Sequence, residues 1–285
     1  MNVALCFSGY CRSLPSTFQY IKRHWIDAFQ PDIFFAGWAE AEVSNAVTLL
    51  NPKSYHVFSP DAVRETLELQ AERINELNIR RVRVESSERV ETTRGIQRFP
   101  SAAEIKESEL SSIGMAIGAQ FLQVQTSIRL ALQYSKIVGK RYDIIIRARP
   151  DTVFFTDRSL YRHSRFEDFR SGYSVDQNPM GMVPVREDEV YTVAIDRINR
   201  GDVFAVNDYF YYGSQSAMGH LANIWDEYEK TMQLIAYGGA VLPLSGINES
   251  ILSAYLARMG VSMIAPLNAS TGVYSRILRS DGSLI

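Results

Sequence analysis

Two arginines and a carboxylate stand at alternate positions at the end of an apolar run. Arg147, Arg149 and Asp151 follow three consecutive isoleucines. Side chains alternate between the two faces of a strand, so these three share one face if the chain stays extended. Pro150 favours that course, because it keeps Arg149 out of the helical region. Such a group suits an anionic ligand or a divalent metal ion.

A purely structural role for these charges is the alternative. Burying an unpaired charge costs several kcal/mol, so buried arginines need partners. A structural ion network would supply them, for example Arg147 with Asp143 or Asp32. Ligands, however, bind at the carboxyl ends of strands in open α/β sheets, which is where this group stands.

A second candidate group is the segment Ser8-Gly9-Tyr10-Cys11-Arg12, which follows the first apolar run. Glycine lets the backbone approach a ligand closely, and a helix that follows offers amide groups to an anion. Arg12 can pair with a phosphate, and Tyr10 can stack on a base. The segment lacks the glycine patterns of a phosphate loop and of a dinucleotide site, which argues against ATP hydrolysis and NAD chemistry.

Two carboxylates are candidates for catalysis. Asp208 stands beside four aromatic residues at 209–212, a setting that suits sugar binding, and we interpret it as a general base or acceptor ligand. The alternative is a turn aspartate followed by core aromatics. Glu249 opens a predicted helix and is either a second sugar-binding carboxylate or a residue that stabilises the helix dipole.

The apolar patterns predict an α/β fold with a mostly parallel sheet and helices on both faces. Expected strands are 3–8, 32–38, 55–58, 142–149 and 203–206, and expected helices are 17–29, 62–77, 115–138, 215–235 and 249–259. We expect one domain over 1–285, with 61–112 as an insertion or mobile segment. Its part 85–112 is polar and aperiodic, which indicates a lid or an ordinary loop.

Composition excludes several classes of protein. The chain has 285 residues with 30 basic and 32 acidic side chains, and no segment has the basic excess of a nucleic-acid binder. Two cysteines are too few for a disulfide framework or a zinc site. No apolar window is long enough for a membrane span, and no signal peptide is evident. We therefore expect a soluble, cytoplasmic protein.

Taken in order, four motifs resemble a group of bacterial and viral glycosyltransferase-like proteins with the GT-A fold. They are Phe-Ser-Gly-x-x-Arg at 7–12, Asp-Ile-Phe-Phe-x-x-Trp at 32–38, the segment 142–151, and Asn-Asp-x-Phe-x-x-Gly-Ser-x-x-x-Met at 207–218. The resemblance implies a Rossmann-like GT-A domain that binds a nucleotide-sugar donor over the first strand and its loop. It also implies transfer of the sugar to a glycan or other hydroxyl acceptor, as in polysaccharide biosynthesis.

The same resemblance places Arg149-Pro150-Asp151 where the family has an Asp-x-Asp motif, which holds the donor through a divalent cation. Arg149 departs from that motif and leaves Asp151 as the implied metal ligand. Hard cations want several oxygen ligands, so either Mg²⁺ or Mn²⁺ binds here or the arginines neutralise the diphosphate themselves. A nucleotide- or glycan-binding protein of the same fold without turnover is the alternative function.

Overall fold

A seven-stranded mixed sheet forms the centre of the molecule. This computed structural model describes residues 1–76, 89–92, 95–98, 107–155, 185–194, 206–237, 247–267 and 274–277. Across the sheet the strands are β10 (Ser262–Leu267), β8 (Glu189–Ala194), β9 (Val206–Gly213), β6 (Ile144–Ala148), β1 (Val3–Ser8), β2 (Asp32–Trp38) and β3 (Ser54–Phe58). Strand β9 is antiparallel to both of its neighbours, and the other pairs are parallel. The expected α/β class and mostly parallel sheet are confirmed.

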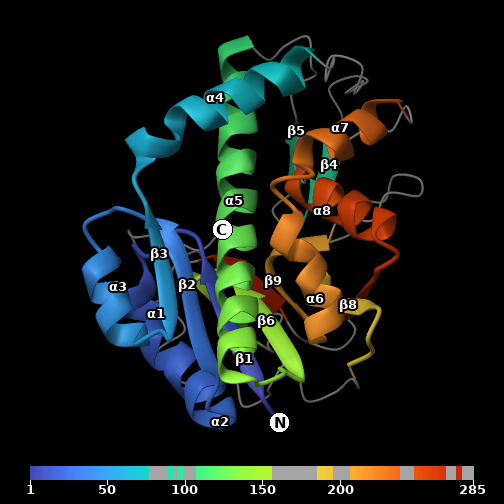
Figure 1. Cartoon of the computed structure of the whole chain (residues 1–285). Helices are drawn as coiled ribbons and strands as arrows, with labels where there is room; N and C mark the ends of the chain where they lie inside the picture. Colours follow the sequence, from blue (N-terminus) through green and yellow to red (C-terminus); the bar gives the residue numbers. More distant parts are fainter. Residues whose placement is uncertain are drawn as a thin grey trace.

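Helices cover both faces of the sheet, which explains why every residue of β1 and β6 is buried (Figure 1). One face carries α1 (Leu14–Ile21), η1 (Lys22–Ile26), α2 (Asp27–Phe29) and α3 (Val43–Leu50), where Phe7 stacks on Trp25. The other face carries α5 (Glu107–Val138), α6 (Gln215–Gly219), η5 (His220–Asn223), α7 (Tyr228–Tyr237) and α8 (Ile247–Arg258).

The segment predicted as an insertion contains regular structure. Helix α4 (Pro60–Glu76) crosses α5, and its Leu67 joins a small core with Trp38 and Phe58 (Figure 1). Strands β4 (Arg89–Thr92) and β5 (Gly95–Arg98) pair as an antiparallel hairpin. Residues 107–112 are the first turns of α5. Part of 85–112 thus has regular structure, the rest of that stretch lies outside the described residues, and its role as a lid stays a prediction.

Helix boundaries differ from the sequence prediction where distant contacts decide them. The first helix begins at Leu14 and not at 17, with Pro15 in its opening turn, where a missing N–H is tolerated. The predicted helix 215–235 is divided into α6, η5 and α7. Ser214 caps α6, since its Oγ accepts the N–H of Ala217 at 3.0 Å. Helix α8 begins at Ile247, which places Asn248 inside it.

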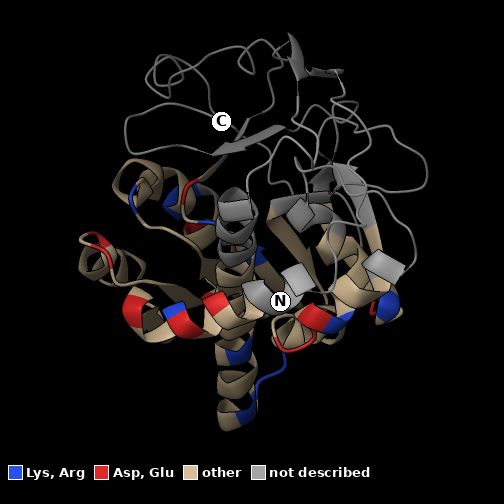
Figure 2. Cartoon of the chain, turned by 90° about the horizontal axis from the view of Figure 1, so that it is seen from above, with Lys and Arg blue, Asp and Glu red and all other residues tan. Residues whose placement is uncertain are grey.

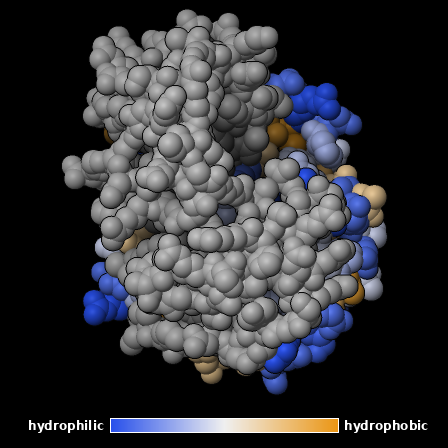
Figure 3. Space-filling model, turned by 180° about the vertical axis from the view of Figure 1, so that it is seen from behind, coloured by the Kyte–Doolittle hydropathy of each residue, from blue (hydrophilic) through white to orange (hydrophobic). Residues whose placement is uncertain are grey.

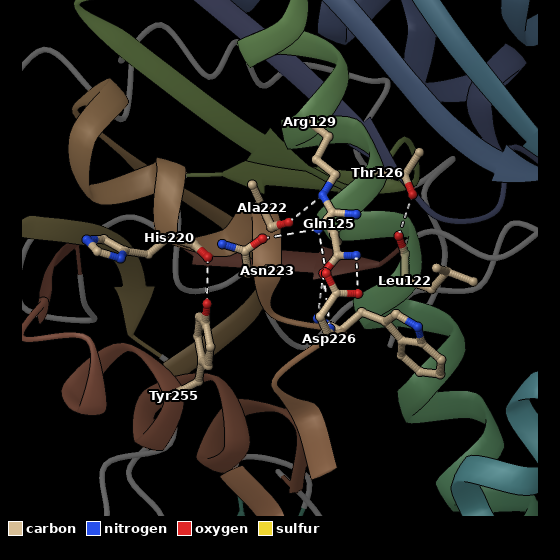
Figure 4. Close-up of polar contacts among 10 residues, drawn as sticks. Leu122, Gln125, Thr126, Arg129, His220, Ala222, Asn223, Asp226 and Tyr255 are labelled. Atoms are coloured by element: carbon tan, nitrogen blue, oxygen red, sulfur yellow. Dashed lines mark hydrogen bonds and ion pairs between the residues drawn. The ribbon is translucent and has the colours of Figure 1, made fainter. Parts of the chain in front are cut away.

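A polar cluster joins α5 to the segment between η5 and α7, and it explains the break in the predicted helix (Figure 4). Gln125 Oε1 accepts the backbone N–H groups of Trp225 (2.9 Å) and Asp226 (3.2 Å), and its Nε2 donates to Asp226 Oδ1 at 3.0 Å. Arg129 donates from Nε to the carbonyl of Ala222 at 2.6 Å and pairs with Asp226. These side chains supply partners that a continuous helix would have provided internally.

Two further strands form a separate small sheet. Strand β7 (Thr152–Phe155) pairs antiparallel with β11 (Tyr274–Ile277). Seen from above, basic and acidic residues alternate along the described parts of the ribbon (Figure 2). From behind, hydrophobic residues show as small separate spots among the mostly hydrophilic described ones (Figure 3).

Within the described residues, no helix has both the length and the apolar character that crossing a bilayer requires.

Candidate functional site

The ends of β1 and β6 form a topological switch point of the sheet. The chain leaves β1 toward β2 and β3 on one side, and it leaves β6 toward β9 and β8 on the other. The connections therefore diverge where these two parallel neighbours end. In open α/β sheets, the region outside the carboxyl ends of such strands is the topological crevice in which ligands bind. The loop 9–12 and the turn 149–152 lie at this place, so the two groups singled out in the sequence come together.

Arg147 lies inside the protein beneath this crevice. Its side chain is 1% exposed, and its Nε donates to Ser8 Oγ at 2.8 Å. Its guanidinium lies 5.2 Å from the ring centre of Tyr211, its cross-strand partner on β9. Ser8 and the aromatic face thus hold a buried cation, as a buried charge requires. Ser8 and Arg147, both expected to bind a ligand, are enclosed and support the site from behind.

Arg149 and Asp151 form a two-bond ion pair with each other. Arg149 Nε donates to Asp151 Oδ1 at 2.9 Å, and Nη2 donates to Oδ2 at 2.8 Å. The Arg149 side chain is 17% exposed, whereas Asp151 is fully enclosed. The guanidinium also lies over the ring of Tyr209 at 5.7 Å, so Arg147 and Arg149 each lie against a tyrosine of β9.

The expected extended course from Arg149 to Asp151 is wrong. Strand β6 ends at Ala148, and the N–H of Thr152 donates to the carbonyl of Arg149 at 3.2 Å. This turn carries Asp151 back to the guanidinium two residues earlier. The turn is favoured over an extended course because it lets Arg149 and Asp151 pair with each other where the strand leaves the sheet.

Asp32 and Asp143, considered from the sequence as ion-pair partners of Arg147, interact with other groups. Asp32 accepts from Lys140 Nζ at 2.6 Å and from the hydroxyl of Tyr142 at 2.9 Å. Burial, together with this bond to Asp32, raises the pKa of Tyr142. Asp143 accepts the backbone N–H of Asn2 at 2.6 Å. Both aspartates lie at the opposite end of the sheet, away from the crevice.

Two glycines allow the loop 9–12 to pack closely on β2 and on the turn after β6. Gly9 has φ of +129°, a backbone conformation that side chains rarely adopt. At Gly37 on β2, which is buried, an added Cβ would lie 2.4 Å from Phe35 Cζ and 3.1 Å from the carbonyl oxygen of Gly9. A Cβ at Gly9 would lie 3.7 Å from Arg149 Cγ and 3.8 Å from Pro150 Cδ. The loop after β1 and the turn after β6 are therefore in contact at Gly9.

Among the candidate residues whose side chains the structure describes, Tyr10 and Arg12 are exposed to solvent. Tyr10 is 44% exposed, and the guanidinium of exposed Arg12 lies 5.1 Å from its ring centre. One face of the expected stacking ring is thus covered by the arginine expected to bind phosphate. A phosphate that engages Arg12 would also act on the position of Tyr10.

The amide groups expected from the following helix are largely used within the chain. The N–H of Leu14 donates to the carbonyl of Cys11 at 2.8 Å, and that of Ser16 donates to Ser13 at 3.0 Å. Pro15 has no N–H. The first turn of α1 is therefore not the anion cradle that the sequence suggested.

Glu40 is a site residue that the sequence reasoning missed. It follows β2 as Ser8–Arg12 follows β1, and its Oε1 accepts the backbone N–H of Cys11. Burial raises the pKa of Glu40, and the Cys11 N–H and Arg12 act in the opposite direction. Its position after a buried strand adjacent to β1 was the signal that could have found it.

The two proposed catalytic carboxylates are described only by their backbone. Asp208 belongs to β9 and Glu249 to α8, and their side chains lie outside the described ones. The aromatic stretch after Asp208 is mainly core, because Phe210, Tyr211 and Tyr212 are buried. For these three rings the structural alternative is confirmed.

A divalent ion on Asp151 would have to compete with Arg149. Both carboxylate oxygens of Asp151 are bound to the guanidinium, so the aspartate could serve a metal only after Arg149 released one of them. Among the described residues, no group of three or more metal-ligating side chains gathers in one place. Mg²⁺ or Mn²⁺ at Asp151 stays a prediction.

The chain matches no family model and no curated protein. What the protein does must therefore be inferred from the chemistry of the site and from the sequence motifs.

Proposed function

We propose that the protein transfers a sugar from a nucleoside-diphosphate-sugar donor to a hydroxyl group of a glycan or similar acceptor. One observation carries this proposal above the others: exposed Arg12 and partly exposed Arg149 belong to the loop 9–12 and the turn 149–152, which meet at the switch point between β1 and β6. Two guanidinium groups at such a place suit a diphosphate. A mixed sheet with one reversed strand is also compatible with the GT-A fold that the motifs resemble.

In this proposal the arginines stabilise the leaving nucleoside diphosphate. Negative charge grows on the diphosphate as the bond to the sugar breaks, and fixed cations near it lower the barrier. Arg12 approaches from the solvent side, and Arg149 is held over the Tyr209 ring by Asp151. Arg147, which donates to Ser8, adds positive potential from within the protein without contact to the ligand.

A divalent cation would supply the same neutralisation if Asp151 exchanged Arg149 for the metal. Hard cations want several oxygen ligands, and the diphosphate itself could provide some of them. Because Arg149 already binds the carboxylate that the cation would need, binding of the donor should be measured both with and without the divalent cation.

Acceptor activation is assigned to Asp208, with Glu249 as a second carboxylate for sugar hydroxyls. If transfer inverts the configuration at the anomeric carbon of the sugar, the acceptor hydroxyl needs a base, and Asp208 is the candidate that the sequence supplies. The supporting argument is the resemblance of the segment 207–218 to the family motif.

A non-catalytic nucleotide- or glycan-binding protein is the second candidate function. The observation in its favour is the internal pairing of Arg149 with Asp151, which satisfies both charges without a ligand. Hydrolysis of the donor in the absence of acceptor separates the two, because a binding protein leaves the donor intact.

A thermal-shift panel of nucleoside diphosphates and their sugars, with and without Mn²⁺, tests the donor site. A ligand at 100 times its dissociation constant adds about 2.7 kcal/mol of stability. We expect at least one nucleoside diphosphate to raise the melting temperature. If none does so in either condition, the donor site is wrong, and with it the proposed function.

A further inference from the structure

Glu40 stands where the oxygen of a bound anion would stand. Its Oε1 accepts the N–H of Cys11, a backbone amide within the loop 9–12. Loop amides beside a glycine are the usual donors to phosphate oxygens. In this structure a carboxylate oxygen from the end of β2 takes that place, while the nearby first-turn amides of α1 are bonded to Cys11 and Ser13.

The surroundings of Glu40 are compensated in charge. Arg12 acts on it as a cation, and Glu42 and Asp151 act on it as anions. The three arginines of the candidate site are thus opposed by three carboxylates: Arg12, Arg147 and Arg149 by Glu40, Glu42 and Asp151. A diphosphate that enters this crevice meets little net positive charge while Glu40 stays ionised on the loop amide.

We propose that Glu40 is an internal competitor of the diphosphate, and that binding a diphosphate displaces its carboxylate from the Cys11 amide. This inference rests on the proposed donor site and adds a residue that sets its affinity. The exchange is one of hydrogen-bond acceptors at a single N–H, so no covalent step is involved. Displacement breaks the bond of Glu40 to the amide, and it moves one negative charge away from the incoming phosphates.

The pH dependence follows from the same contact. A protonated Glu40 has lost its charge and is the weaker acceptor, so it competes less. Burial raises the pKa of Glu40 above its ordinary value, and Glu42 and Asp151 act in the same direction, whereas the Cys11 N–H and Arg12 lower it. The competitor is therefore at full strength above that pKa and fades as the pH falls through it. Toward acid pH, the diphosphate affinity of the native protein should therefore approach that of a variant without the carboxylate.

Calorimetric titration of the full chain with inorganic pyrophosphate tests the inference. Glu40→Ala opens the Cys11 amide, and we expect it to bind pyrophosphate about tenfold more tightly, the equivalent of about 1.4 kcal/mol. Glu42→Gln is the matched control, because it removes one negative charge nearby without a bond to the loop. We expect less than about threefold tightening from it, the scale of a solvent-screened charge.

The opposite role for Glu40 gives the opposite result. If its carboxylate is a brace that holds the loop in the binding conformation, Glu40→Ala weakens pyrophosphate binding, and this outcome overturns the inference. Glu40→Gln keeps an acceptor for the amide and removes only the charge, so it serves if the alanine variant does not fold. Between pH 5 and 8 the advantage of Glu40→Gln over the native protein should grow as the pH rises. A constant ratio contradicts the competitor role.

The inference and the proposed function fail in different ways. If Glu40→Ala tightens pyrophosphate binding and no nucleoside diphosphate binds, the competitor stands and the proposed donor is wrong. If nucleoside diphosphates bind and Glu40→Ala leaves the affinity for pyrophosphate unchanged, the donor site stands and the competitor is wrong. Absence of binding by either anion to either protein refutes both.

Discussion

Replacing Ser8 with alanine removes the hydroxyl to which a buried guanidinium donates. Ser8 is fully buried and Arg147 is 1% exposed, so water cannot take the vacated place without opening the core. A hydrogen bond to a charged group contributes about 1.5–3 kcal/mol. We expect Ser8→Ala to lower the free energy of unfolding by that amount, which corresponds to a melting temperature about 3–10 °C lower for a chain of this size. Urea denaturation measures the first quantity and a thermal melt the second.

Ser127→Ala is the matched control. Ser127 is also fully buried, but its Oγ donates to the carbonyl of Val124 one turn earlier in α5, at 2.9 Å. That carbonyl keeps its helical partner, and alanine is the better helix former, so we expect a change within about 0.5 kcal/mol. If Ser8→Ala costs no more than Ser127→Ala, the bond to Arg147 does not hold the buried cation, and the supporting role given to Ser8 is refuted.

Three other variants test separate parts of the account. Gln125→Ala removes the acceptor of two backbone N–H groups, and we expect it to lower the free energy of unfolding, measured by urea denaturation, by about 2–4 kcal/mol. The neighbouring Thr126→Ala should lower it by less than about 1 kcal/mol. Arg149→Gln leaves the buried carboxylate of Asp151 without its ion-pair partner and should lower the free energy of unfolding by about 3–5 kcal/mol. Adding Asp151→Asn should restore most of that stability, and no recovery would contradict the ion-pair assignment. Asp208→Asn should leave donor affinity nearly intact in calorimetry while transfer falls about 10² to 10⁴-fold, and abolished donor binding would contradict its role as base.

Two strands near the site could be predicted from local sequence alone. Strands β1 and β2 have the predicted bounds, because each is an apolar run that is followed by a small residue. Positive φ at Gly139 and Gly260 likewise agrees with the predicted helix ends. These features depend on residues within a few positions of each other, which is the range over which patterns are informative.

Contacts between distant segments decided the rest. The break after η5 depends on Gln125, which lies 100 positions before Trp225 in the chain. The role of Glu40 depends on the backbone amide of Cys11, 29 positions earlier in the chain. The polar segment after Trp38, in which Glu40 lies, has no periodic pattern that would have indicated this contact. Arg149 and Asp151 were recognised as a charged group, but their mutual pairing required the turn at 149–152, which an extended strand excludes.

The most direct test of the donor site is a calorimetric titration of Arg12→Gln with whichever nucleoside diphosphate most stabilises the native protein. Arg12 is exposed beside the crevice, so its loss should spare the fold and remove one charge-assisted contact to the diphosphate. We expect affinity to fall about tenfold or more. Arg64→Gln, on the exposed face of α4 and paired with Asp61, is the control and should bind within about twofold of the native protein. Equal affinities for the two variants would contradict the proposal that a diphosphate binds between β1 and β6.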